Sequence, residues 1–177
     1  MLEGKNRIKR FEYKKDILNF KFSYNDKETG ELNEILNNNA KINIDQIRRV
    51  ALWKIDRVID IPDNILDKIR SIVSTKTISL DSTEVKKLIE ELISCQGIGM
   101  PMASAILKFY RPDVFPIIDV RAYRALRGKK IYYSQYNVDI YLKYANDLHD
   151  LASSLKRPLR EMDEQLYMYD KEHNKKI

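Results

Sequence analysis

The chain has 177 residues, of which 33% are charged and 44% hydrophobic, a balance typical of one soluble domain or one domain folded as two lobes. Its net charge of +6 favours a polyanionic partner, although solubility alone also accounts for such an excess. A single cysteine excludes a disulfide framework, a cysteine-ligated zinc site and an iron–sulfur cluster within one chain. His149 and His173 do not form a histidine metal motif, so we expect no metal and no cofactor.

The apolar pattern disfavours a secreted protein and a membrane-spanning protein. The N-terminus is basic and lacks the apolar core of a signal peptide, and no apolar run approaches the roughly 18 residues of a membrane span. We therefore expect a cytoplasmic or nucleoid-associated protein that contacts no membrane.

Residues 1–40 are predicted to be a basic and aromatic N-terminal extension that can pack on the domain formed by residues 41–177. Four of its first ten residues are lysine or arginine, which is more typical of a flexible tail than of a segment that recognises DNA. The alternation of Phe20, Phe22 and Tyr24 fits a short strand, and a helix through residues 16–20 fits equally well. The asparagine-rich stretch 33–39 is predicted to be a linker or a frayed turn.

From residue 44 onward the apolar residues recur with helical spacing. This spacing predicts one long helix over residues 44–59, a second from Pro62 to Val73 and a third from Asp81 to Ile93. Asp81 with Glu84 three residues later resembles a capping box at the start of the third helix.

A glycine hairpin over residues 95–100 follows, and Pro101 suits the first turn of a helix that ends before Pro112. Asp119 is predicted to cap the next helix and Gly128 to end it. A tyrosine-rich turn leads to a helix over residues 141–155, and a last helix covers residues 159–169. The sequence therefore predicts an all-α protein of about seven to nine helices.

The hairpin residues Gly97, Ile98 and Gly99 precede a helix N-terminus, where free backbone N–H groups bind phosphate. The following helix is about 15 Å long and the loop 111–118 can span about 26 Å, so the chain can return Asp119 to the hairpin. A phosphate clamp beside a carboxylate suits a protein that holds a nucleic-acid backbone and carries out chemistry next to it.

These residues resemble the helix–hairpin–helix (HhH-GPD) base-excision DNA glycosylase superfamily, as a member without an iron–sulfur cluster. The resemblance rests on Gly97-Ile98-Gly99, on Ala103 and on the string 115–121 around Asp119, which lies twenty residues after the second glycine. It covers residues 92–126, about a fifth of the chain. It implies a two-lobed helical HhH-GPD-like fold and double-stranded DNA, possibly damaged, as the partner, with no protein partner.

The resemblance also implies roles for individual residues. Asp119 would stabilise an oxocarbenium-like sugar and activate water, while the amides of Gly97, Ile98 and Gly99 would hold a backbone phosphate. The base would have to leave the stack and enter a pocket between the lobes. A helix N-cap is the structural alternative for Asp119.

Two departures from the family pattern limit this reading. Gln96 and Cys95 replace the proline and the aliphatic residue of the family's hairpin. Pro101 replaces the lysine that forms a Schiff base in bifunctional members, so only monofunctional base release remains.

Several further side chains are candidates for the DNA interface. Arg121 and Arg124 share a helix face and are candidates for phosphate binding, with a solvated face as the alternative. Trp53, with Lys54 and Arg57, is a candidate base pocket or wedge, although core packing explains Trp53 better.

Two functions follow from the sequence. The first is a monofunctional DNA N-glycosylase without lyase activity that removes a damaged or mismatched base. The alternative is a non-catalytic helix–hairpin–helix DNA-binding module. The presence of Gln96 in place of the family's proline favours this alternative.

Overall fold

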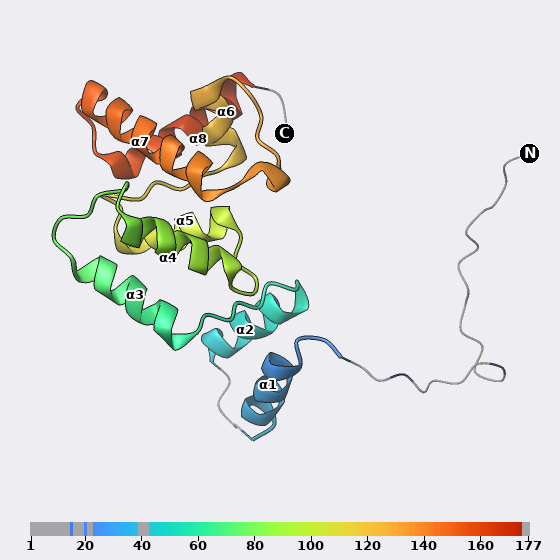
Figure 1. The fold of residues 1–177 in the computed structure, drawn as a ribbon. Coiled ribbons are helices and arrows are strands. Elements are labelled where there is room, and N and C mark those ends of the chain that lie inside the picture. The colour runs from blue at the N-terminus through green and yellow to red at the C-terminus, as the bar shows by residue number, and fades with distance from the viewer. Residues whose placement is uncertain (1–14, 16–19, 21–22, 39–42, 175–177) are drawn as a thin grey trace, which may run out of the picture. The chain divides into compact units, whose positions relative to one another are not determined.

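The computed structural model describes residues 15, 20, 23–38 and 43–174, and its regular elements there are all helices (Figure 1). Eight α-helices and two short 3₁₀ helices confirm the all-α prediction. Among the described helices, none combines the length and the apolar character needed to cross a bilayer. The predictions for residues 1–14 and for the alternation at Phe22 lie outside the described residues.

The described chain divides into two compact units between Asp56 and Arg57. The first contains helices α1 (Asp26–Asn38) and α2 (Ile44–Lys54). The sequence assigned residues 41–56 to the helical domain, whereas the described residues 43–56 belong to the same unit as α1.

Contacts between α1 and α2 hold the first unit together. The guanidinium group of Arg49 binds the carboxylates of Glu28 and Glu31 at 2.7 and 2.9 Å. The indole N–H of Trp53 donates to Thr29 Oγ1 at 2.8 Å, and Leu32 is buried. The predicted linker at 33–39 is therefore wrong, because residues 33–38 continue a helix that α2 supports.

The predicted helix over residues 44–59 is also too long. α2 ends at Lys54, and Asp56 adopts a left-handed conformation with a φ of 54°. Ile55 and Ile59 are exposed, so no packing supports a further turn despite their helical spacing. The Asp60 N–H instead donates to the Gln96 carbonyl at 3.3 Å.

The second unit begins with α3 (Asp63–Ser74), α4 (Thr83–Ser94) and α5 (Met100–Tyr110). It continues with α6 (Val120–Arg127), the 3₁₀ helix η1 (Tyr133–Gln135) and α7 (Val138–Leu155). The 3₁₀ helix η2 (Leu159–Glu161) and α8 (Met162–His173) complete it.

α4 is central to the core of the second unit. It buries Val85, Leu88, Ile89 and Leu92, which share one face at helical spacing. α4 packs against α3, α5 and α7, and α6 packs along α8, as Figure 1 shows. The hairpin therefore lies between two helices anchored in one core.

Of the three helix caps predicted from the sequence, the structure confirms two and moves one by a residue. Asp119 caps α6, and Gly128 ends it in a left-handed conformation with a φ of 66°. Ser82, not Asp81, caps α4, because its hydroxyl accepts from the Val85 N–H at 3.2 Å. Asp81 instead accepts from the side chain of Asn146.

Candidate functional site

The hairpin joins α4 to α5 and is anchored by Ile98. The Ile98 side chain is buried in the core, and its N–H donates to the Cys95 carbonyl at 3.2 Å. The Ile98 amide is thus engaged within the turn, although the sequence placed it among the phosphate-binding amides.

Gly97 is required by the fold. Its φ is +76°, and a Cβ atom at this position would lie 2.3 Å from the carbonyl oxygen of Val58. A side chain would meet both a disfavoured conformation and the backbone of the segment leading into α3.

Gly99 is the N-cap of α5, and no side chain caps this helix. No described residue accepts a hydrogen bond from the N–H groups of Gly97 and Gly99. Pro101 lies in the first turn of α5 and has no N–H to satisfy. The hairpin therefore presents unpaired donors at a positive helix end, an arrangement that suits an anion.

The chain returns from the far end of α5 to a point near the hairpin. The Ile118 N–H donates to Ser104 Oγ at 3.2 Å. Ser104 lies five residues after Gly99, which is about 7.5 Å along the helix axis. Asp119 therefore begins α6 within about two turns of the hairpin.

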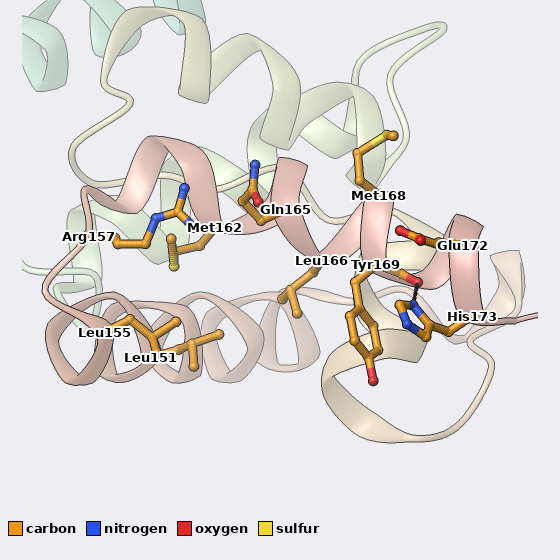
Figure 2. Close-up of a pocket in the computed structure, with 10 residues that line it drawn as sticks. All are labelled: Leu151, Leu155, Arg157, Met162, Gln165, Leu166, Met168, Tyr169, Glu172 and His173. Carbon is orange, nitrogen blue, oxygen red and sulfur yellow. Dashed lines mark hydrogen bonds between the residues drawn. The ribbon is translucent and has the colours of Figure 1, made fainter.

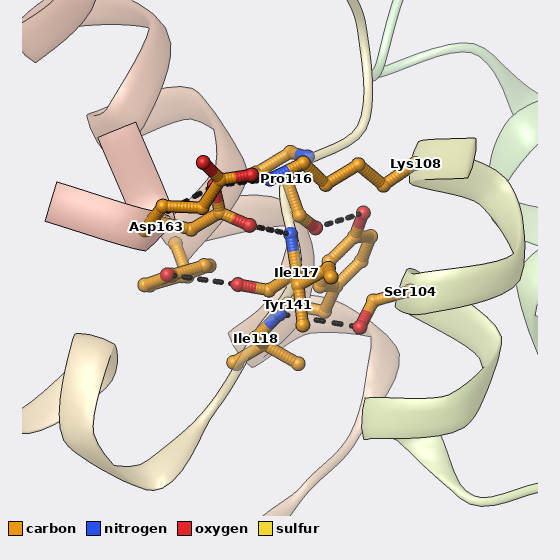
Figure 3. Close-up of polar contacts among 9 residues, drawn as sticks. Ser104, Lys108, Pro116, Ile117, Ile118, Tyr141 and Asp163 are labelled. Carbon is orange, nitrogen blue, oxygen red and sulfur yellow. Dashed lines mark hydrogen bonds and ion pairs between the residues drawn. The ribbon is translucent and has the colours of Figure 1, made fainter. Parts of the chain in front are cut away.

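Side chains from α7 and α8 hold the segment that precedes Asp119 (Figure 3). Tyr141 Oη donates to the Pro116 carbonyl at 3.1 Å, and Tyr144 Oη donates to the Ile117 carbonyl at 3.0 Å. The Ile117 N–H donates to Asp163 Oδ2 at 2.7 Å. These bonds satisfy a buried, non-regular backbone that would otherwise carry a desolvation cost.

Asp163 is buried and is paired with a buried cation. Lys108 Nζ lies 2.6 Å from Asp163 Oδ1 and 2.9 Å from Glu164 Oε1. Burial raises the pKa of Tyr141, and the charge of Asp163 adds to this effect, so the Tyr141 phenol remains a hydrogen-bond donor at neutral pH.

The two carboxylate oxygens of Asp119 have different environments. Oδ1 accepts from the N–H groups of Arg121 at 2.7 Å and Ala122 at 3.3 Å, which is the capping role expected from the sequence. Oδ2 has no partner among the described residues, and the side chain is only partly buried. One oxygen thus fixes the group and leaves the other available for a ligand.

Two pairs of tyrosines pack near the hairpin and α6. Burial raises the pKa of Tyr136 to about 12, and the neighbouring Asp119 and Tyr123 add to the effect. Tyr123 stacks on Tyr144 with ring centroids 6.0 Å apart. Tyr133 packs edge-to-face on Tyr136 at 6.4 Å, and its hydroxyl lies 2.7 Å from where a Cβ atom of Gly99 would be.

Arg121 and Arg124 are bound within the protein. Both guanidinium groups contact Asp170 of α8, at 3.1 Å for Arg121 and 2.7 Å for Arg124. Asp170 is fully buried, and hydrogen bonds from Arg124 lower its pKa to about 2 against the effect of burial. The positive charge of these arginines is therefore largely balanced within the fold.

The remaining predicted residues are Trp53 and Lys54 of the first unit and Arg57 of the second. Trp53 makes its contacts in the first unit, where its ring packs edge-to-face on Tyr24 at 5.0 Å and its N–H is satisfied. Lys54 ends α2, and Arg57 begins the second unit; both are exposed. Packing accounts for Trp53, and the wedge role remains a prediction.

A cavity of about 330 Å³ lies elsewhere, between α7 and α8 (Figure 2). Leu151, Leu155 and Leu166 line it, with Arg157 and His173 among its polar residues. It shares no residue with the hairpin or with Asp119.

Within the described residues, no group of three or more His, Cys, Asp or Glu side chains is arranged to hold a metal ion.

Comparison with protein-family models, curated proteins and solved structures finds no match to this chain.

The sequence did not reveal the side chains that position Asp119. Ser104, Tyr141, Tyr144 and Asp163 act from three helices on one segment, and their contacts span 14 to 46 residues of chain. One signal was present: Lys108 is a charged residue on the mainly apolar, buried face of α5, which is typical of a buried cation that needs a partner.

Proposed function

We propose that this protein binds double-stranded DNA and acts as a monofunctional DNA N-glycosylase of the helix–hairpin–helix type. The observation that carries the proposal is the return of Asp119 to the first turns of α5, with one carboxylate oxygen fixed and the other unpaired. The resemblance of the hairpin and of residues 115–121 to the HhH-GPD glycosylases supports the same reading.

Each part of the site has a role in this chemistry. The amides of Gly97 and Gly99 would hold a phosphate of the DNA backbone at the positive end of α5. The sugar of an extruded nucleotide would then lie near Asp119. The carboxylate would stabilise positive charge on that sugar while the bond to the base breaks.

The reaction is a hydrolysis. A water oxygen bonds to the anomeric carbon, the carbon–nitrogen bond breaks with its electron pair going to the base, and Asp119 Oδ2 takes the proton from the water. Lyase chemistry would need an amine beside the hairpin. Pro101 has none, and Lys108, farther along α5, is buried in its ion pair with Asp163.

One observation favours a non-catalytic DNA-binding module as the second candidate. Asp119 already has a structural role as the N-cap of α6, a role that requires no catalysis. Such a module would bind DNA with strong salt dependence and release no base.

The experiment that separates the two uses duplexes carrying damaged and mismatched bases. Each is incubated with wild type or Asp119→Asn, and abasic sites are revealed with alkali. We expect wild type to release at least one base and Asp119→Asn to be at least about 100-fold slower with similar DNA affinity. Asn keeps a side-chain oxygen for the cap, so α6 should remain folded.

Borohydride treatment of the same reactions serves as the control for lyase activity, and no covalent adduct should form. Release at the wild-type rate by Asp119→Asn would refute the catalytic role. DNA binding with no base released from any duplex would favour the non-catalytic module.

A further inference from the structure

The turn between α6 and α7 exposes two aromatic rings although the chain is fixed on both sides of it. This tyrosine-rich turn covers residues 132–137, contains the 3₁₀ helix η1 and lies between the buried side chains of Ile131 and Val138. Tyr132 and Tyr133 are nevertheless 60% and 77% exposed. Neighbouring exposed aromatic side chains on a turn with regular structure are typical of a binding surface.

The turn lies beside the glycine hairpin. The three atoms that would be nearest to a Cβ atom on Gly99 all belong to Tyr133, with its hydroxyl oxygen at 2.7 Å. The ring of Tyr133 packs edge-to-face on Tyr136 with ring centroids 6.4 Å apart, and most of its surface remains in solvent. An exposed ring therefore lies next to the turn that the proposed function assigns to a backbone phosphate.

The charge around the turn is positive and is not balanced nearby. No acidic residue occurs in the sequence between Asp119 and Asp139. Lys129 and Lys130 are exposed, and neither pairs with a carboxylate among the described residues. Lys130 Nζ instead lies 5.7 Å from the centroid of the Tyr132 ring. Cations beside exposed rings suit a polyanion that carries flat aromatic groups, which is a nucleic acid.

The ring of Tyr133 also restricts which nucleic acid fits. In a continuous duplex both faces of each base are covered by its neighbours, so an aromatic side chain can stack only on a base that has left the stack. Such a base would have to lie close to the phosphate at the hairpin, because Tyr133 lies beside Gly99.

We propose that the tyrosine-rich turn is a second DNA-binding element, in which Tyr133 stacks on an unpaired base while Lys129 and Lys130 contact the flanking phosphates. This inference rests on the DNA binding of the proposed function and names its substrate class. DNA with a base outside the stack is bound more tightly than the same duplex fully paired.

The test measures the affinity of wild type, Tyr133→Ala and Tyr133→Phe for two labelled duplexes, one fully paired and one with a single unpaired adenine. We expect wild type to bind the bulged duplex about 5- to 100-fold more tightly than the paired one. Tyr133→Ala should bind both duplexes alike, with its affinity for the paired duplex within about twofold of wild type. Tyr133→Phe should keep the preference, because the ring and not the hydroxyl stacks.

A fluorescent base reports the stacking itself. With 2-aminopurine at the unpaired position, stacking on an aromatic ring lowers the emission of the base. Binding of wild type or Tyr133→Phe should therefore lower the emission, whereas binding of Tyr133→Ala should not.

The two lysines have a separate readout. The double variant Lys129→Gln, Lys130→Gln should weaken binding to both duplexes alike. It should also reduce the slope of log affinity against log salt by about 2, one unit for each lost phosphate contact.

Tyr110→Ala is the matched control for the loss of an exposed ring. Tyr110 is 60% exposed and ends α5, whereas the hairpin precedes the start of that helix. Its affinity for both duplexes and its effect on the emission of 2-aminopurine should equal those of wild type.

The outcomes distinguish this inference from the function on which it rests. If wild type binds both duplexes equally, or if Tyr133→Ala keeps the preference for the bulge, the role of Tyr133 is overturned and the proposed DNA binding stands. A loss of the preference in Tyr133→Phe equal to that in Tyr133→Ala would also overturn stacking, because the hydroxyl would then make the contact. If wild type binds neither duplex, the proposed function fails and this inference with it.

Discussion

Gly97 and Gly128 share a left-handed conformation, but their surroundings differ. A Cβ atom at Gly97 would lie 2.3 Å from the backbone oxygen of Val58, whereas Gly128 has open space around it. Gly128→Ala should therefore cost only the conformational strain, about 1–2 kcal/mol of unfolding free energy. Gly97→Ala should cost at least about 1 kcal/mol more, because the hairpin must also move away from Val58.

Urea denaturation of the two variants beside wild type measures this difference. An equal loss of stability in both would mean that the segment before α3 does not pack against the hairpin as closely as the structure shows.

At the scale of single residues, the sequence identified the groups whose role is local. The cap at Asp119 and the stop at Gly128 depend on nearest neighbours in the chain, so residue type and spacing were enough to predict them. The roles of Ser104 and Tyr141 depend on segments that fold back from elsewhere. No local pattern distinguishes a tyrosine whose hydroxyl is paired from one whose hydroxyl is not.

At the scale of elements, Asp170 of α8 forms ion pairs with Arg121 and Arg124 of α6 and so holds the two helices together. Its carboxylate is fully buried and receives hydrogen bonds from Arg121, Arg124 and Asn174. Asp170→Asn should lower the unfolding free energy by about 2–4 kcal/mol at pH 7, since it leaves two arginines without their shared carboxylate. Asp67→Asn, which breaks an exposed pair with Arg70, should change it by less than about 0.5 kcal/mol.

The same carboxylate gives the stability a pH dependence. The pKa of Asp170 is about 2 in the folded protein and near 3.8 when unperturbed, so the unfolded state takes up a proton first as pH falls. The contribution is complete above about pH 5 and is lost as pH falls towards 2, with a size of about 2 kcal/mol. Between pH 5 and 2, wild type should therefore lose about 2 kcal/mol more than Asp170→Asn.

Denaturant titrations of both proteins across this range provide the measurement. Parallel pH profiles for wild type and Asp170→Asn would contradict the assignment of the lowered pKa to this residue.

The boundaries of α2 and α4 show which features of an element its sequence determines. Apolar periodicity placed the helices from α2 onward, but Ile55 and Ile59 continue that periodicity into a segment that is not helical. Whether a turn forms there depends on packing, which is a tertiary property. α4 begins after Ser82 rather than Asp81 because Asp81 binds Asn146, a residue 65 positions away.

At the scale of the whole molecule, the surplus of positive charge is distributed differently from the sequence prediction. Arg121 and Arg124 are balanced by Asp170, whereas Lys129 and Lys130 just beyond α6 are exposed. Lys130 lies over the ring of Tyr132 at 5.7 Å, so a cation and an aromatic face lie together beside the tyrosine-rich turn. These lysines are better placed than the arginines to contact a phosphate backbone.

In the proposed function, the hairpin binds DNA and Asp119 promotes release of the base. Gly99→Ala tests the hairpin without breaking the fold, because the three atoms nearest its Cβ atom all belong to the exposed side chain of Tyr133, which can move away. The methyl group should crowd the amides that a phosphate must approach.

The most direct measurement records duplex affinity and the base-release rate at saturating enzyme for wild type, Gly99→Ala and Asp119→Asn. We predict that Gly99→Ala weakens affinity by about tenfold and keeps most of the rate, whereas Asp119→Asn keeps the affinity and loses the rate. Full base release by Asp119→Asn, or equal losses of affinity and rate in both variants, would contradict these separate roles of the hairpin and Asp119.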